Sequence, residues 1–281
     1  MSSDDLSILL PEWQGCAADP GVAAGARALA GLFRPGAFVE VEAPDSEALT
    51  PEDGVMGLAS IAPRAAQTLE LLRAKRPARI FMVGGTCGVE LAPVAYLNDR
   101  LKGNLAVVWL DAHADLNTPE TSPSGRFHGM VLRTLLGSGP AALVRLVTRP
   151  LSATQVVLAG SRDLDRDERT FVSNAAISLL SPADVLVPGR LMGRIRAGGF
   201  TQVYVHLDLD VIDPIELPDV AVPAPGGVSI DNVTDTLREL GSAFTIAGFS
   251  VIEFRPRSVD GVRKVGRLLG QCGITIGALG A

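Results

Sequence analysis

The chain has 281 residues, of which 47% are hydrophobic, and its formal net charge is −6. This length fits one large α/β domain, and the apolar content is enough for a large core. The acidic balance excludes the basic surface typical of nucleic-acid binding, so we expect no nucleic-acid partner.

Three cysteines, Cys16, Cys87 and Cys272, are spread along the chain. A sparse, odd set argues against a disulfide framework and fits a reducing cytoplasm. The first residues, MSSDDLSILLPEW, do not have the pattern of a signal peptide, and no apolar run is long enough to span a membrane. We therefore expect a cytoplasmic protein that has no membrane partner.

Short apolar runs alternate with amphipathic segments along the chain. Strands are predicted at residues 6–10, 37–42, 79–83, 105–110, 155–159, 176–180, 202–208 and 245–252. Helices are predicted at residues 20–33, 61–75, 88–101, 128–136, 166–174, 181–197, 229–240 and 257–269. Residues 43–55 and 116–126 have the composition of loops. This alternation is typical of a parallel sheet with helices on both faces, and no change of composition marks a second domain, so we predict one α/β domain over residues 1–281.

The most informative stretch follows the predicted strand at 105–110 and reads DAHADLNTPETSPSGRFH. Asp111, His113 and Asp115 alternate with alanine, and side chains at such spacing leave an extended segment on the same side. Crowded carboxylates repel one another unless a cation lies among them, and this set of oxygen and nitrogen atoms suits a divalent metal. A polar strand end or a helix cap is the alternative interpretation.

A second cluster, in the segment YVHLDLD, has the same period of two at His206, Asp208 and Asp210. Both clusters lie at the carboxyl ends of predicted strands, and so does the segment GGTC at residues 84–87. Ligands of parallel α/β sheets bind at this edge. The two clusters together predict one metal site there.

Further candidates lie at the same edge. Glu253 ends the last predicted strand, where a salt bridge with Arg255 or Arg257 is the alternative to a functional role. His128 opens a helix directly after the loop that follows the first cluster, which favours a functional role for it.

Five motifs follow one another along the chain: a glycine pair after a strand, DAHAD, a loop ending in HG, DxDxxDP and a late glutamate before a proline. This series resembles that of the ureohydrolase family, the arginases and agmatinases. The resemblance covers about residues 80–256. It implies a three-layer α/β/α fold with a mainly parallel eight-stranded sheet, two manganese ions, and a homo-oligomer that is a trimer or a hexamer. By position, it implies the metal ligands Asp111, His113, Asp115, Asp208 and Asp210.

The resemblance also implies roles around the substrate. His128 matches a histidine that shuttles protons, and Glu253 matches a glutamate that holds the guanidinium. Asn117 and Ser124 match positions that contact the α-carboxylate of an amino acid. Asp165 and Glu168 match positions that contact its α-amino group. Arg126 stands where arginases usually have Asn, and a guanidinium there can still hold a carboxylate.

The largest departure from the family is at Thr86 and Cys87, because the usual GGDH is GGTC here. Cys87 could bind as a thiolate and favour a softer metal such as zinc, iron or cobalt, could bind manganese weakly, or could leave a site for one metal only. A similar exchange of His for Cys occurs in family relatives that hydrolyse N-hydroxy-arginine. His206 is a further alternative ligand, although its Cα lies behind that of Asp208 on the strand.

The expected activity is metal-dependent hydrolysis of the guanidino group of arginine, or of an arginine-like amino acid, to urea or a urea derivative and an amine. The metals would activate a water, Asp115 would take its proton, and His128 would pass one to the departing amine. The alternatives are release of hydroxyurea from N-hydroxy-arginine, hydrolysis of another amide or formimino substrate, and a non-catalytic protein that binds such ligands.

Overall fold

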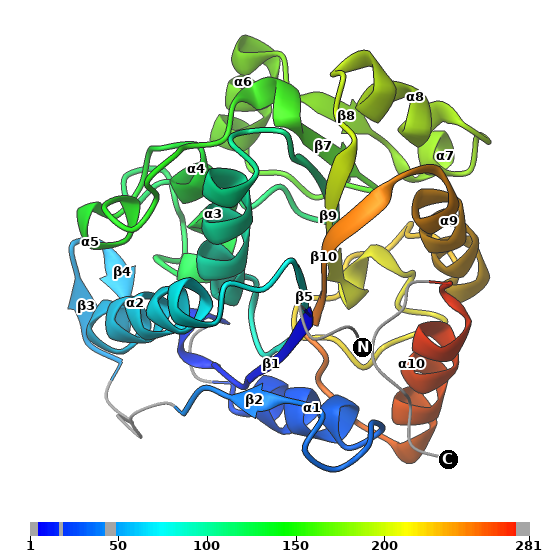
Figure 1. Ribbon diagram of the computed structural model, residues 1–281, viewed down its shortest axis with the longest axis horizontal. Helices are drawn as coiled ribbons and strands as arrows, with labels where there is room; N and C mark the ends of the chain where they lie inside the picture. Colours follow the sequence, from blue (N-terminus) through cyan, green and yellow to red (C-terminus); the bar gives the residue numbers. More distant parts are fainter. Residues whose placement is uncertain (1–4, 17–18, 43–48, 274–281) are drawn as a thin grey trace.

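The computed structural model describes residues 5–16, 19–42 and 49–273 (Figure 1). The strands of its main sheet are β1 (Asp5–Leu10), β2 (Val39–Glu40), β5 (Arg79–Gly84), β6 (Ala106–Leu110), β7 (Val156–Ala159), β8 (Ser178–Leu180), β9 (Gln202–Asp208) and β10 (Thr245–Ile252). They form one eight-stranded sheet in the order β2-β1-β5-β10-β9-β6-β7-β8, and every pairing in it is parallel. The α/β fold with an eight-stranded sheet is confirmed.

Helices cover both faces of this sheet. The α-helices are α1 (Gly21–Ala30), α2 (Leu58–Lys75), α3 (Leu91–Arg100), α4 (Val131–Leu135), α5 (Ala141–Val144), α6 (Arg166–Ala175), α7 (Pro182–Val185), α8 (Arg190–Ala197), α9 (Ile230–Ala243) and α10 (Val259–Gln271). Short 3₁₀ helices are η1 (Gln14–Cys16), η2 (Cys87–Glu90), η3 (Phe127–Met130), η4 (Ala153–Gln155) and η5 (Leu209–Val211). Within the described ranges, no helix has the length and apolar character needed to cross a membrane.

The sheet separates two apolar cores. Alternate side chains of β6 enter opposite cores: Val107 and Trp109 pack with α2, α3 and α4, whereas Ala106, Val108 and Leu110 pack with α1, α8, α9 and α10. Figure 1 shows these two groups of helices on either side of the strands. Burial on both faces explains why the central strands are nearly continuous apolar runs.

The predicted helix at 181–197 is wrong as one element. The structure has two helices there, α7 and α8, and Gly189 between them adopts a left-handed conformation with φ of 74°. Pro188, just before it, has no backbone N–H to continue a helix. A Pro-Gly pair is therefore the reason that the element is divided.

The predicted loop at 43–55 is also partly wrong. Residues 43–48 lie outside the described part of the chain, but β3 (Pro51–Glu52) and β4 (Val55–Met56) pair as a small antiparallel hairpin. Its turn is Asp53-Gly54, with φ of 48° and 75°. Asp-Gly between short strands is a strong hairpin signal, so this element could have been read from the sequence.

Two helical glycines predict opposite effects of the same substitution. A Cβ at Gly25 in α1 would lie 1.8 Å from the carbonyl oxygen of Phe254, whereas a Cβ at Gly193 in α8 would meet nothing within 4 Å. Gly25→Ala should therefore lower the free energy of unfolding by about 1–3 kcal/mol through overpacking. Gly193→Ala should raise it by about 0.5–1 kcal/mol because alanine favours a helix. Urea denaturation of both variants measures this, and equal changes would contradict the packing of α1 against the end of β10.

Candidate metal centre and substrate pocket

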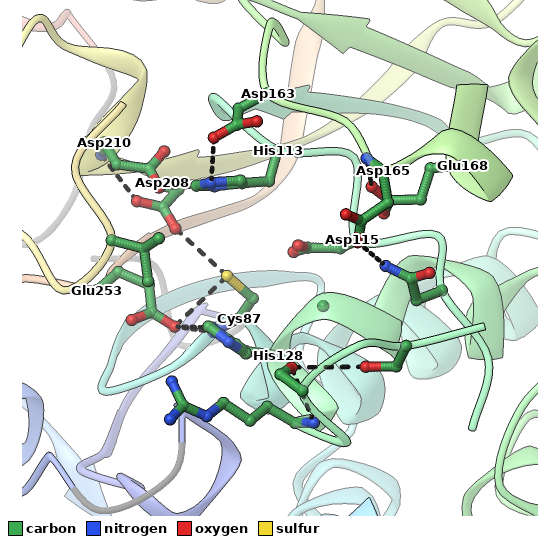
Figure 2. Close-up of a pocket in the computed structure, with 16 residues that line it drawn as sticks. Cys87, His113, Asp115, His128, Asp163, Asp165, Glu168, Asp208, Asp210 and Glu253 are labelled. Atoms are coloured by element: carbon green, nitrogen blue, oxygen red, sulfur yellow. Dashed lines mark hydrogen bonds and ion pairs between the residues drawn. The ribbon is translucent and has the colours of Figure 1, made fainter. Parts of the chain in front are cut away.

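The candidate site lies at the carboxyl ends of the four central strands, which are adjacent in the order β5-β10-β9-β6. Twelve of the thirteen predicted site residues line one cavity of about 240 Å³ there (Figure 2). The thirteenth, Asp111, is fully buried next to the cavity. The residues that line the cavity are Cys87, His113, Asp115, Asn117, Ser124, Arg126, His128, Asp165, Glu168, Asp208, Asp210 and Glu253.

One group of ligand atoms in this site comes from Asp111, His113 and Asp210, whose atoms lie within 4.8 Å of one another. The His113 Nδ1 atom is 2.9 Å from Asp210 Oδ2 and 3.5 Å from Asp111 Oδ1. Backbone N–H groups hold the two carboxylates, because His113 N donates to Asp111 Oδ1 at 2.6 Å and Ala112 N donates to Asp210 Oδ1 at 3.0 Å. The DxHxD and DxD clusters therefore meet, as the sequence predicts.

A second group shares Asp111 with the first. It consists of Cys87, Asp111, Asp115 and His206, whose potential ligand atoms also lie within 4.8 Å of one another. The Cys87 thiol donates to Asp208 Oδ2 at 3.3 Å, which brings the second DxD carboxylate to the same place. Asp111 thus contributes a potential ligand atom to both groups.

The electrostatics of the site favour a cation. Burial, and then neighbouring carboxylates, raise the pKa values of Asp115 and Asp208 well above the ordinary value. Burial followed by Asp111 raises the pKa of Asp210 to about 6. Burial would also raise the pKa of Asp111, but contacts with two histidines lower it. Several acids therefore crowd into a space that disfavours negative charge.

Orphaned polar atoms lead to the same conclusion. Asp115 Oδ2 and Glu253 Oε2 are buried and, among the described residues, have no hydrogen-bond partner. A buried oxygen without a partner costs free energy, and a divalent ion would remove that cost at Asp115. Burial, followed by the charge of Asp115, raises the pKa of the Cys87 thiol, but coordination to a metal deprotonates a thiol outright. The residues present therefore fit a metal centre.

Two site residues adopt strained backbone conformations. Asp115 has φ of 53° and Glu253 has φ of 58°, in the left-handed region that non-glycine residues rarely adopt. Each follows a strand directly or nearly so, and each turns the chain so that a carboxylate faces the cavity (Figure 2). Strain of this kind persists where the surrounding structure holds a functional side chain in place.

Glu253 contacts both Cys87 and His128. Its Oε1 atom accepts a hydrogen bond from Cys87 N at 3.0 Å and lies 3.3 Å from His128 Nδ1. These contacts occupy Oε1 and leave Oε2 available. The predicted alternative for Glu253, a salt bridge with Arg255 or Arg257, is wrong, since Arg255 pairs with Asp19 and Glu253 has no such pairing in the described part of the chain.

The polar wall of the cavity is arranged around Asn117. Its Nδ2 donates to Asp165 Oδ2 at 2.8 Å, and its Oδ1 accepts from Thr121 Oγ1 at 2.9 Å. Glu168 is buried, and its two oxygens accept backbone N–H groups of Leu116 and Asp165, both at 2.8 Å. Asp165 is exposed to the cavity, so it is better placed than Glu168 to meet a substrate cation.

Some residues of the site were missed in the sequence. Asp163, Ser122 and Val222 also line the cavity, and Asp163 Oδ2 lies 3.9 Å from His113 Nε2. Asp163 belongs to the charged run SRDLDRDE, so its position directly after β7 was an available signal. Val222 lies in a long loop between β9 and α9, and nothing in the sequence assigns it to this cavity.

Similar proteins identify the class of this fold. The structure of Entamoeba histolytica arginase in complex with L-ornithine superimposes with a TM-score of 0.86 over 97% of this chain and 98% of that one, at 22% identity. Arginase from Bacillus caldovelox superimposes with a TM-score of 0.84 over 96% of this chain and 97% of that one, at 25% identity. The chain therefore has the arginase-like α/β fold.

The family itself follows from the sequence comparison. A sequence model described as "Arginase family" matches residues 40–264, and this chain belongs to that family. Arginase from Staphylococcus aureus strain COL is 33% identical over 181 residues, which is 62% of this chain and 60% of the relative. The match thus spans less than two thirds of that relative's length.

The crowded acids predict how a metal and pH act together on stability. In the metal-free protein, the folded-state pKa of Asp210 is raised to about 6, so the stability contributed by its proton is lost as pH rises through that value. The raised pKa values of Asp115 and Asp208 likewise make the metal-free protein less stable as pH rises. Adding Mn²⁺ should therefore raise the melting temperature more at pH 8 than at pH 5. Calorimetry with and without Mn²⁺ measures this, Asp210→Asn should reduce the difference, and a larger rise at pH 5 would contradict it.

Proposed function

We propose that this chain is a metal-dependent amidinohydrolase that cleaves the guanidino group of arginine, or of an arginine-like amino acid, to urea or a urea derivative and an amine. The observation that carries the proposal is the pair of ligand clusters sharing Asp111 at the floor of a polar cavity. Membership of the arginase family supports the same reaction class.

The proposed ligands supply a centre for two cations, with Mn²⁺ as the expected metal and a softer metal possible because of the Cys87 sulfur. A metal pair supplies the chemistry that the protein lacks, because it lowers the pKa of a bound water toward neutrality. The ligands are Cys87, Asp111, His113, Asp115, Asp208 and Asp210.

Three side chains then act on the substrate and its protons. Glu253 Oε2, which has no hydrogen-bond partner among the described residues, accepts the guanidinium and orients its carbon. Asp115, through the carboxylate oxygen that does not bind the metal, accepts the proton of the attacking water. His128, whose side chain is 16% exposed and lies beside Glu253, passes a proton from solvent to the departing amine.

The opposite wall of the cavity suits the backbone end of an amino acid. Asp165 faces the α-amino group, while Asn117 and Ser124 donate to the α-carboxylate. Arg126 adds a positive charge to this carboxylate subsite. Glu168 holds Asp165 and the loop after Asp115 through its two backbone contacts and so acts as a positioning residue.

Cys87 favours a second candidate, the release of hydroxyurea from N-hydroxy-arginine, because the resemblance associates this cysteine with relatives of that activity. A non-catalytic protein that binds a guanidino ligand is the alternative from another class. We also propose a homo-oligomer, a trimer or hexamer, located in the cytoplasm.

The direct test is hydrolysis by the purified chain loaded with Mn²⁺. Arginine, N-hydroxy-arginine, agmatine and other guanidino acids are each supplied, and urea or hydroxyurea is measured. We expect product from at least one amino acid, and His113→Ala should abolish turnover because it removes a ligand of the first cluster. No product from any compound at full metal loading would leave the non-catalytic alternative, and full activity of His113→Ala would refute the ligand set.

Substitution of Arg126 tests the amino-acid subsite. Hydrogen bonds to charged groups contribute about 1.5–3 kcal/mol, so Arg126→Ala should lower kcat/KM for the amino-acid substrate by roughly tenfold to a hundredfold. The same variant should change kcat/KM for agmatine by less than about twofold, because agmatine has no α-carboxylate. Equal losses for both compounds would mean that Arg126 does not read the carboxylate; Arg126→Lys, which keeps the charge, serves as the matched control.

A further inference from the structure

His206 on β9 is a fully buried histidine with no role in the mechanism above. Its ring is stacked on Trp109 with centroids 3.5 Å apart and an interplanar angle of 7°. Trp109 also donates from Nε1 to Asp111 Oδ2 at 3.1 Å. The tryptophan therefore fixes both the plane of the imidazole and the neighbouring carboxylate.

Each ring nitrogen of His206 faces a buried carboxylate. Nδ1 lies 3.2 Å from Glu90 Oε1, an ion-pair distance at which the two atoms do not have hydrogen-bond geometry, and Nε2 lies 3.3 Å from Asp111 Oδ2. Glu90 is itself held by Tyr204, whose hydroxyl donates to Glu90 Oε2 at 2.5 Å. A histidine that binds a metal usually presents its other nitrogen to a carboxylate, which fixes the tautomer and the ring orientation. Glu90 stands in that position behind His206.

The forward nitrogen of His206 belongs to the second cluster of ligand atoms. One ring nitrogen of His206 lies within 4.8 Å of the Cys87 sulfur and of carboxylate oxygens of Asp111 and Asp115, and all four side chains are buried. Nε2 is the nitrogen on this side, because it lies 3.3 Å from Asp111 Oδ2. Asp115 Oδ2 has no hydrogen-bond partner among the described residues, which is an independent indication of a missing ligand. The Cα of His206 is two residues behind Asp208, but the imidazole extends far enough to join the group.

We propose that His206 is a metal ligand and that Glu90 and Tyr204 are positioning residues for it. This inference rests on the metal centre of the proposed function and deepens it. Cys87, Asp111, Asp115 and His206 offer one sulfur, two oxygens and one nitrogen, a set that favours Zn²⁺ or Co²⁺ over Mn²⁺. On binding, the thiol of Cys87 bonds the cation and releases its proton to solvent.

The two cation positions are therefore chemically unequal. The cluster of Asp111, His113 and Asp210 offers two oxygens and one nitrogen and suits Mn²⁺. The cluster with Cys87 and His206 binds the softer ion. A protein supplied with both metals should take one of each, which a centre of two equal positions would not do.

The experiment uses the metal-free full chain and Co(II) as the probe. Titration should give a near-ultraviolet sulfur-to-cobalt charge-transfer band with the first equivalent, which is lost in Cys87→Ser. His206→Gln keeps a side-chain N–H that can donate to Asp111 but removes the imidazole ligand. We expect His206→Gln to weaken binding of the first equivalent of Co(II) by at least about tenfold and to shift the visible absorption bands of the bound cobalt. Loss of a residue that only contacts a metal ligand already weakens metal binding by about tenfold or more.

His128→Gln is the matched control, because it makes the same change at another histidine near Cys87, in the separate group of Cys87, His128 and Glu253. It should leave the affinity and spectrum of the first equivalent unchanged. Glu90→Gln keeps the size of the side chain and should weaken binding through His206 by about tenfold, which supplies a second test if His206→Gln does not fold. Unchanged cobalt binding in His206→Gln, or a loss in His128→Gln instead, overturns the proposal. Neither result depends on turnover, so failure of the hydrolase assay is distinguishable.

Discussion

The constraint on which this structure depends is the burial of one carboxylate, Asp111, between two groups of ionisable side chains. Its Oδ1 faces His113, and its Oδ2 faces Trp109 and His206. Such a charge is tolerated only when every lone pair is matched by a donor or a cation. Two of the three groups of potential ligand atoms found among the described residues include Asp111, so the position of this one carboxylate relates those two groups to each other.

The fold provides this arrangement because its central strands are parallel and adjacent. Their carboxyl ends lie at one edge, and each contributes a short segment to the site: Cys87 after β5, Asp111 after β6, Asp208 at the end of β9 and Glu253 after β10. The scaffold behind them is apolar on both faces and stiff. It can therefore hold Glu253 in a left-handed conformation that would cost free energy in an isolated loop.

Much of this could be predicted from the sequence, because two kinds of pattern have a direct physical meaning. Apolar runs that alternate with helical periods define a parallel sheet, and two acids and a histidine directly after such a run indicate a ligand cluster at a strand end. The period of two is not the reason that they meet, because β6 ends at Leu110 and Asp115 has a left-handed φ of 53°. The Asp53-Gly54 hairpin and the Pro-Gly break before α8 had signals too, but short elements carry few residues and are easily absorbed into neighbours.

Other features could not be predicted, because they depend on contacts between distant segments. The direction of the His206 imidazole is set by Trp109 on a different strand, and the partner of Glu168 is the backbone of Leu116. Strand spacing gives the position of a Cα atom only. It does not say how far a long side chain reaches, or which of two carboxylates it meets.

Thr86 and Cys87, which depart from the family motif, each contact a side chain from another segment of the chain. Thr86 donates to Glu12 Oε1 at 3.0 Å, and Glu12 is buried, so a glutamate from the first loop supplies the carboxylate next to the position where the family usually has Asp. Cys87 adds sulfur, and His206 places an imidazole beside it from the neighbouring strand. A carboxylate and an imidazole, the two groups that the family motif GGDH supplies, are therefore present here, but Glu12 and His206 supply them from other segments of the chain.

This arrangement has a consequence for how metal preference is determined. If the imidazole at this centre comes from His206, then Cys87 alone does not decide which cation binds. The preference arises from four side chains on three strand ends and from Glu90, which contacts the histidine from behind. A histidine at position 87 would bring a second imidazole close to His206, one face of which Trp109 already covers. The residues at positions 87, 90 and 206 are therefore coupled, and the chemistry of the centre is a property of the set.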